Sequence, residues 1–274
     1  MKNLFLAITI VISGVGFLPL QAQKKLNPVI TLQIPEGDGS NSAAVAWNPL
    51  TKKYYTSMAG NAIYPMAVYD IKGKTIQDDV IADNDLRGIW FNPISKKIEF
   101  NCYDSGGIGH LELDVKGKID SKQIDIEGMN QPDGQCVGVY YTAGNFIIYF
   151  NSNTYSVEKY NPKTGKLVGT LSTLHIGCKT KSEMEEMDAD TEITRWDARN
   201  KSVVHYTGIP KSELAILNID DHTIELYDQK TGLLTKTAYS IPEEIPLYAS
   251  FNFSYNNGIW WFFNKEERKW VGCK

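Results

Sequence analysis

Each of the five segments that join successive strand-rich units of this sequence holds at least one acidic side chain that could bind a ligand. The candidates are Asp38, Asp85, Asp133, Asp188 or Asp190, and Glu243 or Glu244. Carboxylate oxygens can bind Ca²⁺, and a pair of carboxylates can supply the acid and base of glycoside hydrolysis. The alternative is that an Asp in a glycine-rich turn accepts hydrogen bonds from its own backbone. That alternative suits Asp38, which lies between two glycines, and Asp133, which lies between Pro132 and Gly134.

Arg87, at the end of one of these segments, is a basic residue that could bind a ligand. It precedes an inner strand of the second unit, where a side chain can point into a central channel. A guanidinium group binds a carboxylate ligand as a bidentate fork. The competing expectation is an ion pair with a neighbouring acid, either Asp85 or Asp133.

Other motifs with a known chemistry are missing from the sequence. The glycine-rich stretch 103–110 opens no helix after a strand, so it predicts a hairpin and no dinucleotide site. The sequence has no G-x-S-x-G nucleophile motif. The histidines stand on separate elements and form no metal-binding motif; they are His110, His175, His205 and His222.

The first 22 residues indicate a secretory signal peptide. Met1-Lys2-Asn3 is a short basic start, the segment 4–20 is apolar, and Ala22 offers a small residue for cleavage. The alternative is an N-terminal membrane anchor, for which the apolar run is short. We therefore expect a periplasmic or extracellular protein with no later membrane span. The formal net charge of −4 over the whole chain gives no overall signature of binding to nucleic acid or anionic lipid.

Export would place the four cysteines in an oxidising compartment, where disulfides are permitted. The cysteines are Cys102, Cys136, Cys178 and Cys273. Their spacing matches no compact zinc motif. The expected strand directions favour a Cys136–Cys178 bond, and a Cys102–Cys136 bond is the rival.

A repeated unit organises residues 23–274. Four stretches end a strand in a similar tight turn: Tyr69–Lys74, Leu113–Lys118, Tyr160–Lys166 and Tyr227–Gly232. The first two units also share Asn-Pro followed by a hydroxyl residue and two lysines, which predicts a hairpin. Four units hold four short strands each, and the fifth holds three.

The strand missing from the fifth unit is available near the N-terminus, where residues 28–34 form an isolated strand. This arrangement predicts an all-β domain, a five-bladed β-propeller closed by its N-terminal strand, with no open sheet edge in the ring. The repeats are similar in general pattern to the YVTN, NHL and WD40-like propellers. They lack a Gly-His…Trp-Asp pair and an Asp-box, so the resemblance implies architecture only. Six blades is the alternative if the insertion described next forms a degenerate blade.

An insertion at about residues 171–202 interrupts the repeat. Its acidic stretch 181–188 predicts a helix capped by Ser182, with Met184, Met187 and Trp196 facing the body of the domain. Long connections are often functional, and a plain surface loop is the alternative.

These features favour a non-catalytic binding module. Its ligand would be a small molecule, a glycan or a protein, held on the channel face that carries the blade-to-blade connections. There the candidate acids would converge, with Ca²⁺ as a possible cofactor. Most of the aromatic residues should pack between blades, and a minority should line the channel mouth. The alternative function is a carboxylate-based hydrolase acting on carbohydrate, and a scaffold role in an envelope assembly is a third hypothesis.

Overall fold

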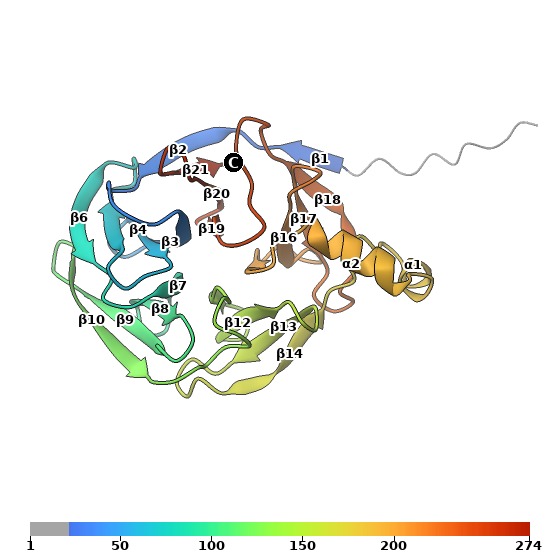
Figure 1. Cartoon of the computed structure of the whole chain (residues 1–274), viewed down its shortest axis with the longest axis horizontal. Helices are drawn as coiled ribbons and strands as arrows, with labels where there is room; N and C mark the ends of the chain where they lie inside the picture. The colour runs from blue at the N-terminus through green and yellow to red at the C-terminus, as the bar shows by residue number, and fades with distance from the viewer. Residues whose placement is uncertain (1–21) are drawn as a thin grey trace, which may run out of the picture.

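The chain forms a closed ring of five β-sheets. The computed structural model describes residues 22–274. Four of the sheets have four antiparallel strands, and the remaining one has the same four-stranded core with a short parallel strand added at its outer edge (Figure 1). The prediction of an all-β, five-bladed propeller is therefore confirmed. The predicted signal peptide, residues 1–22, lies outside the described residues except for Ala22.

The strands divide among the blades as follows. Blade 1 holds β3 (Asn41–Asn48), β4 (Lys53–Ala59), β5 (Pro65–Tyr69) and β6 (Thr75–Ile81). Blade 2 holds β7 (Leu86–Asn92), β8 (Lys97–Cys102), β9 (Ile108–Leu113) and β10 (Ile119–Ile126). Blade 3 holds β11 (Val139–Tyr141), β12 (Phe146–Asn151), β13 (Ser156–Tyr160) and β14 (Leu167–Thr173). Blade 4 holds β15 (His205–Tyr206), β16 (Leu214–Asn218), β17 (Thr223–Tyr227) and β18 (Leu234–Ser240). Blade 5 holds β19 (Phe253–Asn256), β20 (Ile259–Asn264), β21 (Lys269–Cys273) and β2 (Pro28–Gln33).

The N-terminal strand closes the ring as predicted. Strand β2 pairs antiparallel with β21, with Leu32 opposite Trp270. A further short strand, β1 (Ala22–Lys25), adds in parallel to the outer edge of blade 4 through β18. The sequence analysis missed β1 because four residues without alternating hydrophobicity give no strand signal.

The repeated turns are held by one recurring side-chain contact. In each, an Asp or Asn at the end of the third strand accepts a hydrogen bond of 2.8 Å from the backbone N–H two residues later. These acceptors are Asp70, Asp114, Asn161 and Asp228. The glycine that follows has positive φ, which a residue without Cβ adopts at no steric cost. The repeat in the sequence is thus the chemistry of one turn used four times.

Large apolar side chains fill the wedges between blades. Between blades 5 and 1, Trp261 packs edge-on against Tyr54 with ring centroids 5.1 Å apart, and Trp270 is fully buried beside them. In the cluster between blades 2 and 3, Tyr149 and Tyr160 of blade 3 pack edge-on beside Trp90 of blade 2. This confirms that most aromatic residues serve the core.

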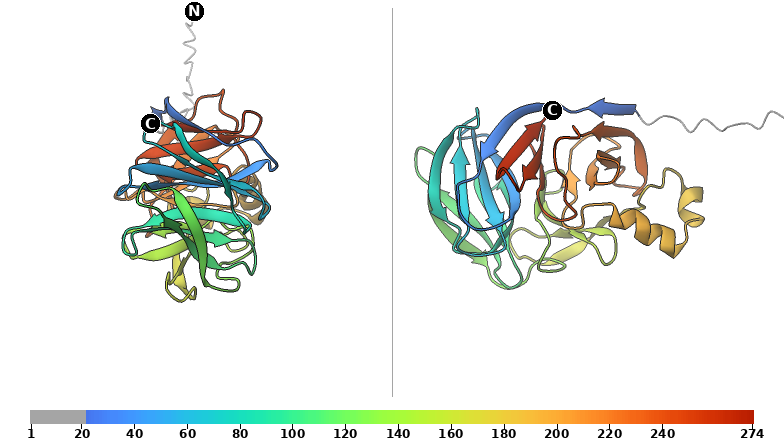
Figure 2. Two further views of the ribbon diagram at one scale, coloured as in Figure 1. Left: turned by 90° about the vertical axis from the view of Figure 1, so that its left-hand side faces the viewer. Right: turned by 45° about the horizontal axis from the view of Figure 1, so that its top comes forward.

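The insertion forms two helices, α1 (Lys181–Glu185) and α2 (Ala189–Asp197), and no sixth blade. They project beyond the rim of the ring (Figure 2). Thr180 caps α1 in place of the expected Ser182, and Asp188 caps α2 by accepting from the Thr191 N–H at 2.8 Å. Trp196 faces the body as predicted, stacked between Phe150 and Tyr155. Neither helix is long enough to cross a bilayer, so residues 22–274 contain no candidate membrane-spanning helix.

Both predicted disulfides are wrong in this structure, because all four cysteines are free and buried. The Cys136 thiol donates to the Phe150 carbonyl at 3.2 Å, within the core between blades 2 and 3. The Cys178 sulfur instead lies 3.8 Å from the Met187 sulfur, beside the insertion helices. The two cysteines therefore belong to different packing regions, and burial raises the pKa of the Cys136 thiol.

Candidate functional site

The two ends of the blades differ in construction and are named here. The turn side holds the short links between first and second strands and between third and fourth strands (residues 49–52, 70–74, 93–96, 114–118, 142–145, 161–166, 207–213, 228–233 and 257–258). The connection side holds the remaining loops and the blade-to-blade segments (residues 34–40, 60–64, 82–85, 103–107, 127–138, 152–155, 174–204, 219–222, 241–252 and 265–268).

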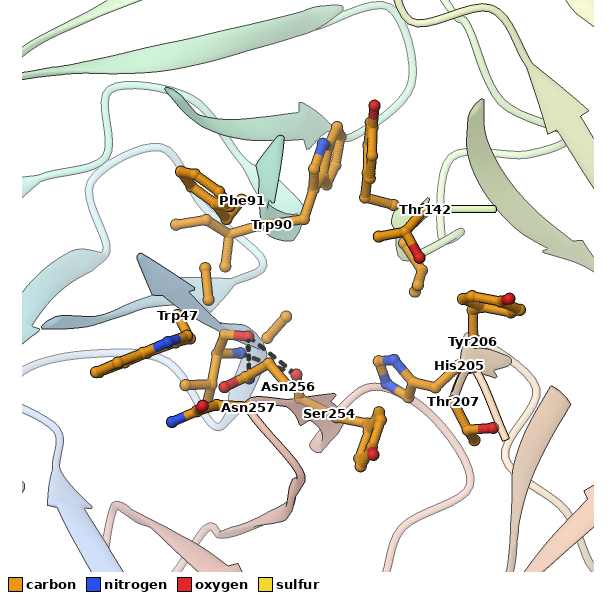
Figure 3. Close-up of a pocket in the computed structure, with 18 of the residues that line it drawn as sticks. Trp47, Trp90, Phe91, Thr142, His205, Tyr206, Thr207, Ser254, Asn256 and Asn257 are labelled. Carbon is orange, nitrogen blue, oxygen red and sulfur yellow. Dashed lines mark hydrogen bonds between the residues drawn. The ribbon is translucent and has the colours of Figure 1, made fainter. Parts of the chain in front are cut away.

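A central cavity of about 390 Å³ lies among the five inner strands (Figure 3). Its walls are residues of all five inner strands, from Ala44 in blade 1 to Asn256 in blade 5. Exposed lining residues such as Pro49, Thr142 and Gly208 all belong to the turn side. The cavity therefore opens on the turn side, whereas the sequence analysis placed the ligand on the connection side.

Aromatic side chains supply much of the cavity wall. They are Trp47, Trp90, Phe91, Tyr140, Tyr206 and Tyr255. Each lies within two residues of the end of its inner strand, where the chain leaves the ring centre for the hairpin. Tyr206 and Tyr255 are half-buried, so their rings remain partly accessible from the cavity. A minority of the aromatic residues does line a channel mouth, as expected, but this mouth lies on the turn side and not on the connection side.

Blades 4 and 5 contribute neutral polar groups to the same cavity. The Ser254 hydroxyl and the Asn256 amide donate to the Val45 carbonyl at 3.1 and 2.8 Å, which ties blade 5 to blade 1. His205 contacts the Phe253 carbonyl through Nε2 at 3.3 Å, and its buried Nδ1 has no hydrogen-bond partner. Burial lowers the pKa of His205 to about 4, so its imidazole is neutral at pH 7.

The cavity lining contains no Asp, Glu, Lys or Arg. A wall of aromatic rings and neutral hydrogen-bonding groups can stack on a flat, uncharged ligand and orient it. It supplies neither the paired carboxylates of a glycosidase nor a hard-cation site. The sequence analysis did not identify this site because the aromatic residues carried a stronger expectation of core packing. Their shared place just before the inner hairpin was the available signal.

Arg87 is buried at the connection end of the inner strand of blade 2. Its guanidinium forms a two-point ion pair with Asp85 and lies 4.6 Å from the Tyr103 ring and 5.4 Å from the Phe251 ring. Phe251 lies on the segment 241–252, which joins blade 4 to blade 5 and reaches into the centre of the ring in Figure 1. Arg87 thus makes the competing contact with Asp85 rather than projecting freely into a channel.

The structure does not gather the other predicted site residues around one mouth. Asp133 accepts from the Gln135 N–H at 2.6 Å, as a turn residue does. Asp190 lies in the first turn of α2 beyond the rim, and Glu244 is exposed on the segment before β19. Asp38 is exposed in a second hollow of about 220 Å³, together with Glu36 and other acids. Across residues 22–274 no three His, Cys, Asp or Glu side chains are grouped to hold a metal.

Comparisons with known proteins found similar chains among solved structures. No protein-family model and no curated protein matches the sequence. Among solved structures, the chain is similar to one from a nidogen–laminin complex (12% identity, 76% of this chain and 66% of that one, TM-score 0.39). It is also similar to streptogramin B lyase (15% identity, 86% and 65%, TM-score 0.40). A Bacteroides thetaiotaomicron protein of unknown function is a third neighbour (11% identity, 84% and 58%, TM-score 0.44). The chain spans about two thirds or less of the length of each.

Proposed function

We propose that this protein is an exported, non-catalytic binding module that holds a compact, uncharged ligand in its central cavity. The observation that carries the proposal is the cavity wall, which is rich in aromatic rings and free of charged side chains. Neutral sugars and other small molecules with a flat apolar face fit this chemistry, because such a face can stack on an aromatic ring while polar edges form hydrogen bonds.

Tyr206 is the wall residue best placed to contact a ligand. Its ring packs edge-on against Tyr141 with centroids 4.6 Å apart and remains half-buried at the mouth. Thr142, on the neighbouring blade, is exposed at the same mouth. A ring-shaped ligand could therefore stack near Tyr206 while its edge reaches the Thr142 hydroxyl.

The carboxylate-hydrolase alternative has less support. It needs two carboxyl groups about 5–9.5 Å apart that share a space with substrate. Asp85 is already paired with Arg87, and Asp190 and Glu244 are exposed on segments away from the cavity. No observation therefore favours a second function over binding.

Isothermal titration of residues 23–274 against a panel of neutral mono- and oligosaccharides tests the proposal. Tyr206→Ala should weaken binding of a responding sugar about tenfold through lost stacking, whereas Tyr206→Phe should change it far less. Asp38→Ala and Glu244→Ala are the controls and should leave affinity unchanged. Equal binding by wild type and Tyr206→Ala, or a loss of binding caused by Glu244→Ala, would contradict the proposal that the ligand binds in the central cavity.

A further inference from the structure

Charge is divided between the two sides of the ring. The turn-side segments hold ten lysines and four acidic residues, a formal charge of +6. The connection-side segments hold seven basic and twenty acidic residues, a formal charge of −13. The net charge of −4 for the whole chain conceals this separation. When positive and negative charges lie on opposite sides of a protein, a charged surface attracts one side and repels the other, and this orients the protein.

The basic side also exposes aliphatic side chains at the tips of its turns. Three adjacent turns carry them in blades 1 and 2: Leu50 is 62% exposed, Ile94 is 60% exposed and Val115 is fully exposed. Each tip is followed within three residues by two lysines, at positions 52 and 53, 96 and 97, and 116 and 118. The first and third turns touch, because the Tyr55 hydroxyl donates to the Gly117 carbonyl at 2.8 Å and Gly117 packs on Thr51.

Most of these lysines are available to a partner. Within residues 22–274, Lys52, Lys96 and Lys116 form no ion pair, whereas Lys97 is paired with Glu112 at 2.9 Å. The nearby Asp114 carboxylate accepts from the Lys118 and Lys116 backbone N–H groups, both at 2.8 Å, and these bonds lower its pKa. The acid within the patch is therefore engaged by its own turn.

We propose that the turn side of blades 1 and 2 docks on an anionic lipid bilayer. Lysine ammonium groups interact with lipid phosphates, and exposed aliphatic tips insert at the headgroup boundary. A soluble polyanion would use the lysines but would leave Leu50, Ile94 and Val115 in water. The acidic connection side is repelled by the same surface, so only one orientation is favourable.

Docking in this orientation turns the mouth of the central cavity toward the bilayer, since that mouth lies on the turn side. The inference does not depend on the proposed ligand, because the docking residues line none of the cavity's aromatic wall.

Vesicle co-sedimentation of residues 23–274 tests the proposal. Binding is expected to phosphatidylcholine vesicles that contain about 30% phosphatidylglycerol, with loss of binding as salt is raised. Pure phosphatidylcholine vesicles should bind far less. Equal binding to the two vesicle types would overturn the electrostatic basis of the proposal.

Two double variants locate the docking surface. Lys52→Glu with Lys116→Glu should weaken binding at least about thirtyfold. Lys179→Glu with Lys181→Glu, an equal change of net charge on the connection side, is the matched control and should retain most binding. If both double variants lose binding equally, net charge rather than this patch explains it and the proposal fails.

Substitution of the exposed aliphatic residues at the turn tips distinguishes docking on a bilayer from binding to a soluble polyanion. Leu50→Ser with Val115→Ser should reduce vesicle binding about tenfold, while Ile63→Ser with Ile193→Ser, at exposed connection-side positions, should not. An unchanged affinity of the Leu50/Val115 variant would identify a soluble polyanion as the partner and overturn the bilayer assignment. Circular dichroism melting curves of all variants exclude loss of fold as the cause.

Discussion

The two sides of this propeller differ in what lies at the centre of the ring. On the connection side, the long segment 241–252 carries Phe251 against Arg87 at the start of β7, and both side chains are buried there. On the turn side, short links leave the ring centre open as a cavity with an aromatic wall. The comparison teaches that irregularity in the repeat serves structure here, while the open site lies beside the regular turns.

The insertion shows the structural use of irregular sequence most clearly. Arg199, just after α2, forms an ion pair with Glu225 of blade 4 at 2.6 Å, and both side chains are more than nine-tenths buried. Glu225 also accepts from Asn218 and Tyr227, so its charge is fully engaged. This network anchors the end of the insertion to the ring.

Removing the Arg199 side chain is expected to give the largest effect of the changes considered. Arg199→Ala leaves the Glu225 carboxylate buried without its counter-ion, which should lower the free energy of unfolding by about 3–5 kcal/mol. Urea denaturation measures it. The control is Lys201→Ala, whose exposed pair with Asp197 should contribute below about 1 kcal/mol. Equal, small losses for both variants would mean that the connection side is not held by this network.

The histidine of the open cavity should make stability depend on pH. The folded-state pKa of His205 is about 4, below the ordinary value of 6.5, so the unfolded chain binds more protons between these values. Stability should therefore fall by about 3 kcal/mol as the pH drops from 6.5 to 4. His205→Phe should flatten that part of the curve in denaturation experiments at stepped pH. Parallel curves for wild type and variant would contradict the prediction.

Two turn-side glycines differ in their surroundings: one packs against the neighbouring blade, and the other has open space beside it. Gly232 and Gly258 have nearly equal φ, +67° and +66°. A Cβ on Gly232 would lie 1.8 Å from the Thr173 carbonyl oxygen, whereas one on Gly258 meets nothing within 4 Å. Gly258→Ala should cost about 1–2 kcal/mol from backbone strain alone. Gly232→Ala should cost about 2 kcal/mol more, and similar melting temperatures for the two variants would show that the outer turn is not clamped.

Much of the fold could be predicted because the repeated turns depend on contacts between residues that are close in the sequence. Asp70 and its three counterparts define a turn through contacts within a few residues, and alternating hydrophobicity defines the strands beside it. The strand at 28–34 then had a single vacant place to fill. The disulfides could not be predicted, because the separation of Cys136 from Cys178 depends on how the insertion packs against blades 3 and 4.

The candidate site was harder to predict than the fold. Five acids in corresponding segments suggested convergence, yet Asp190 lies on a helix beyond the rim and Asp85 is paired with Arg87. The direction of a loop is set by its neighbours rather than by its own residues, so acids in separate loops carry little information about one another. The aromatic wall, by contrast, stands on strands whose positions the sequence did predict.

By itself the sequence determined the order of the strands within the blades and the closure of the ring, and it favoured five blades over six. These features follow from local turns and from the need to pair every strand of the ring. Tertiary structure alone decided which end of the channel is open. Arg87 and Phe251 are far apart in the chain and meet only across the closed ring, where burial makes their contact favourable. The separation of charge between the two sides was present in the composition of the turns, but it had no meaning until the fold placed each turn on its side.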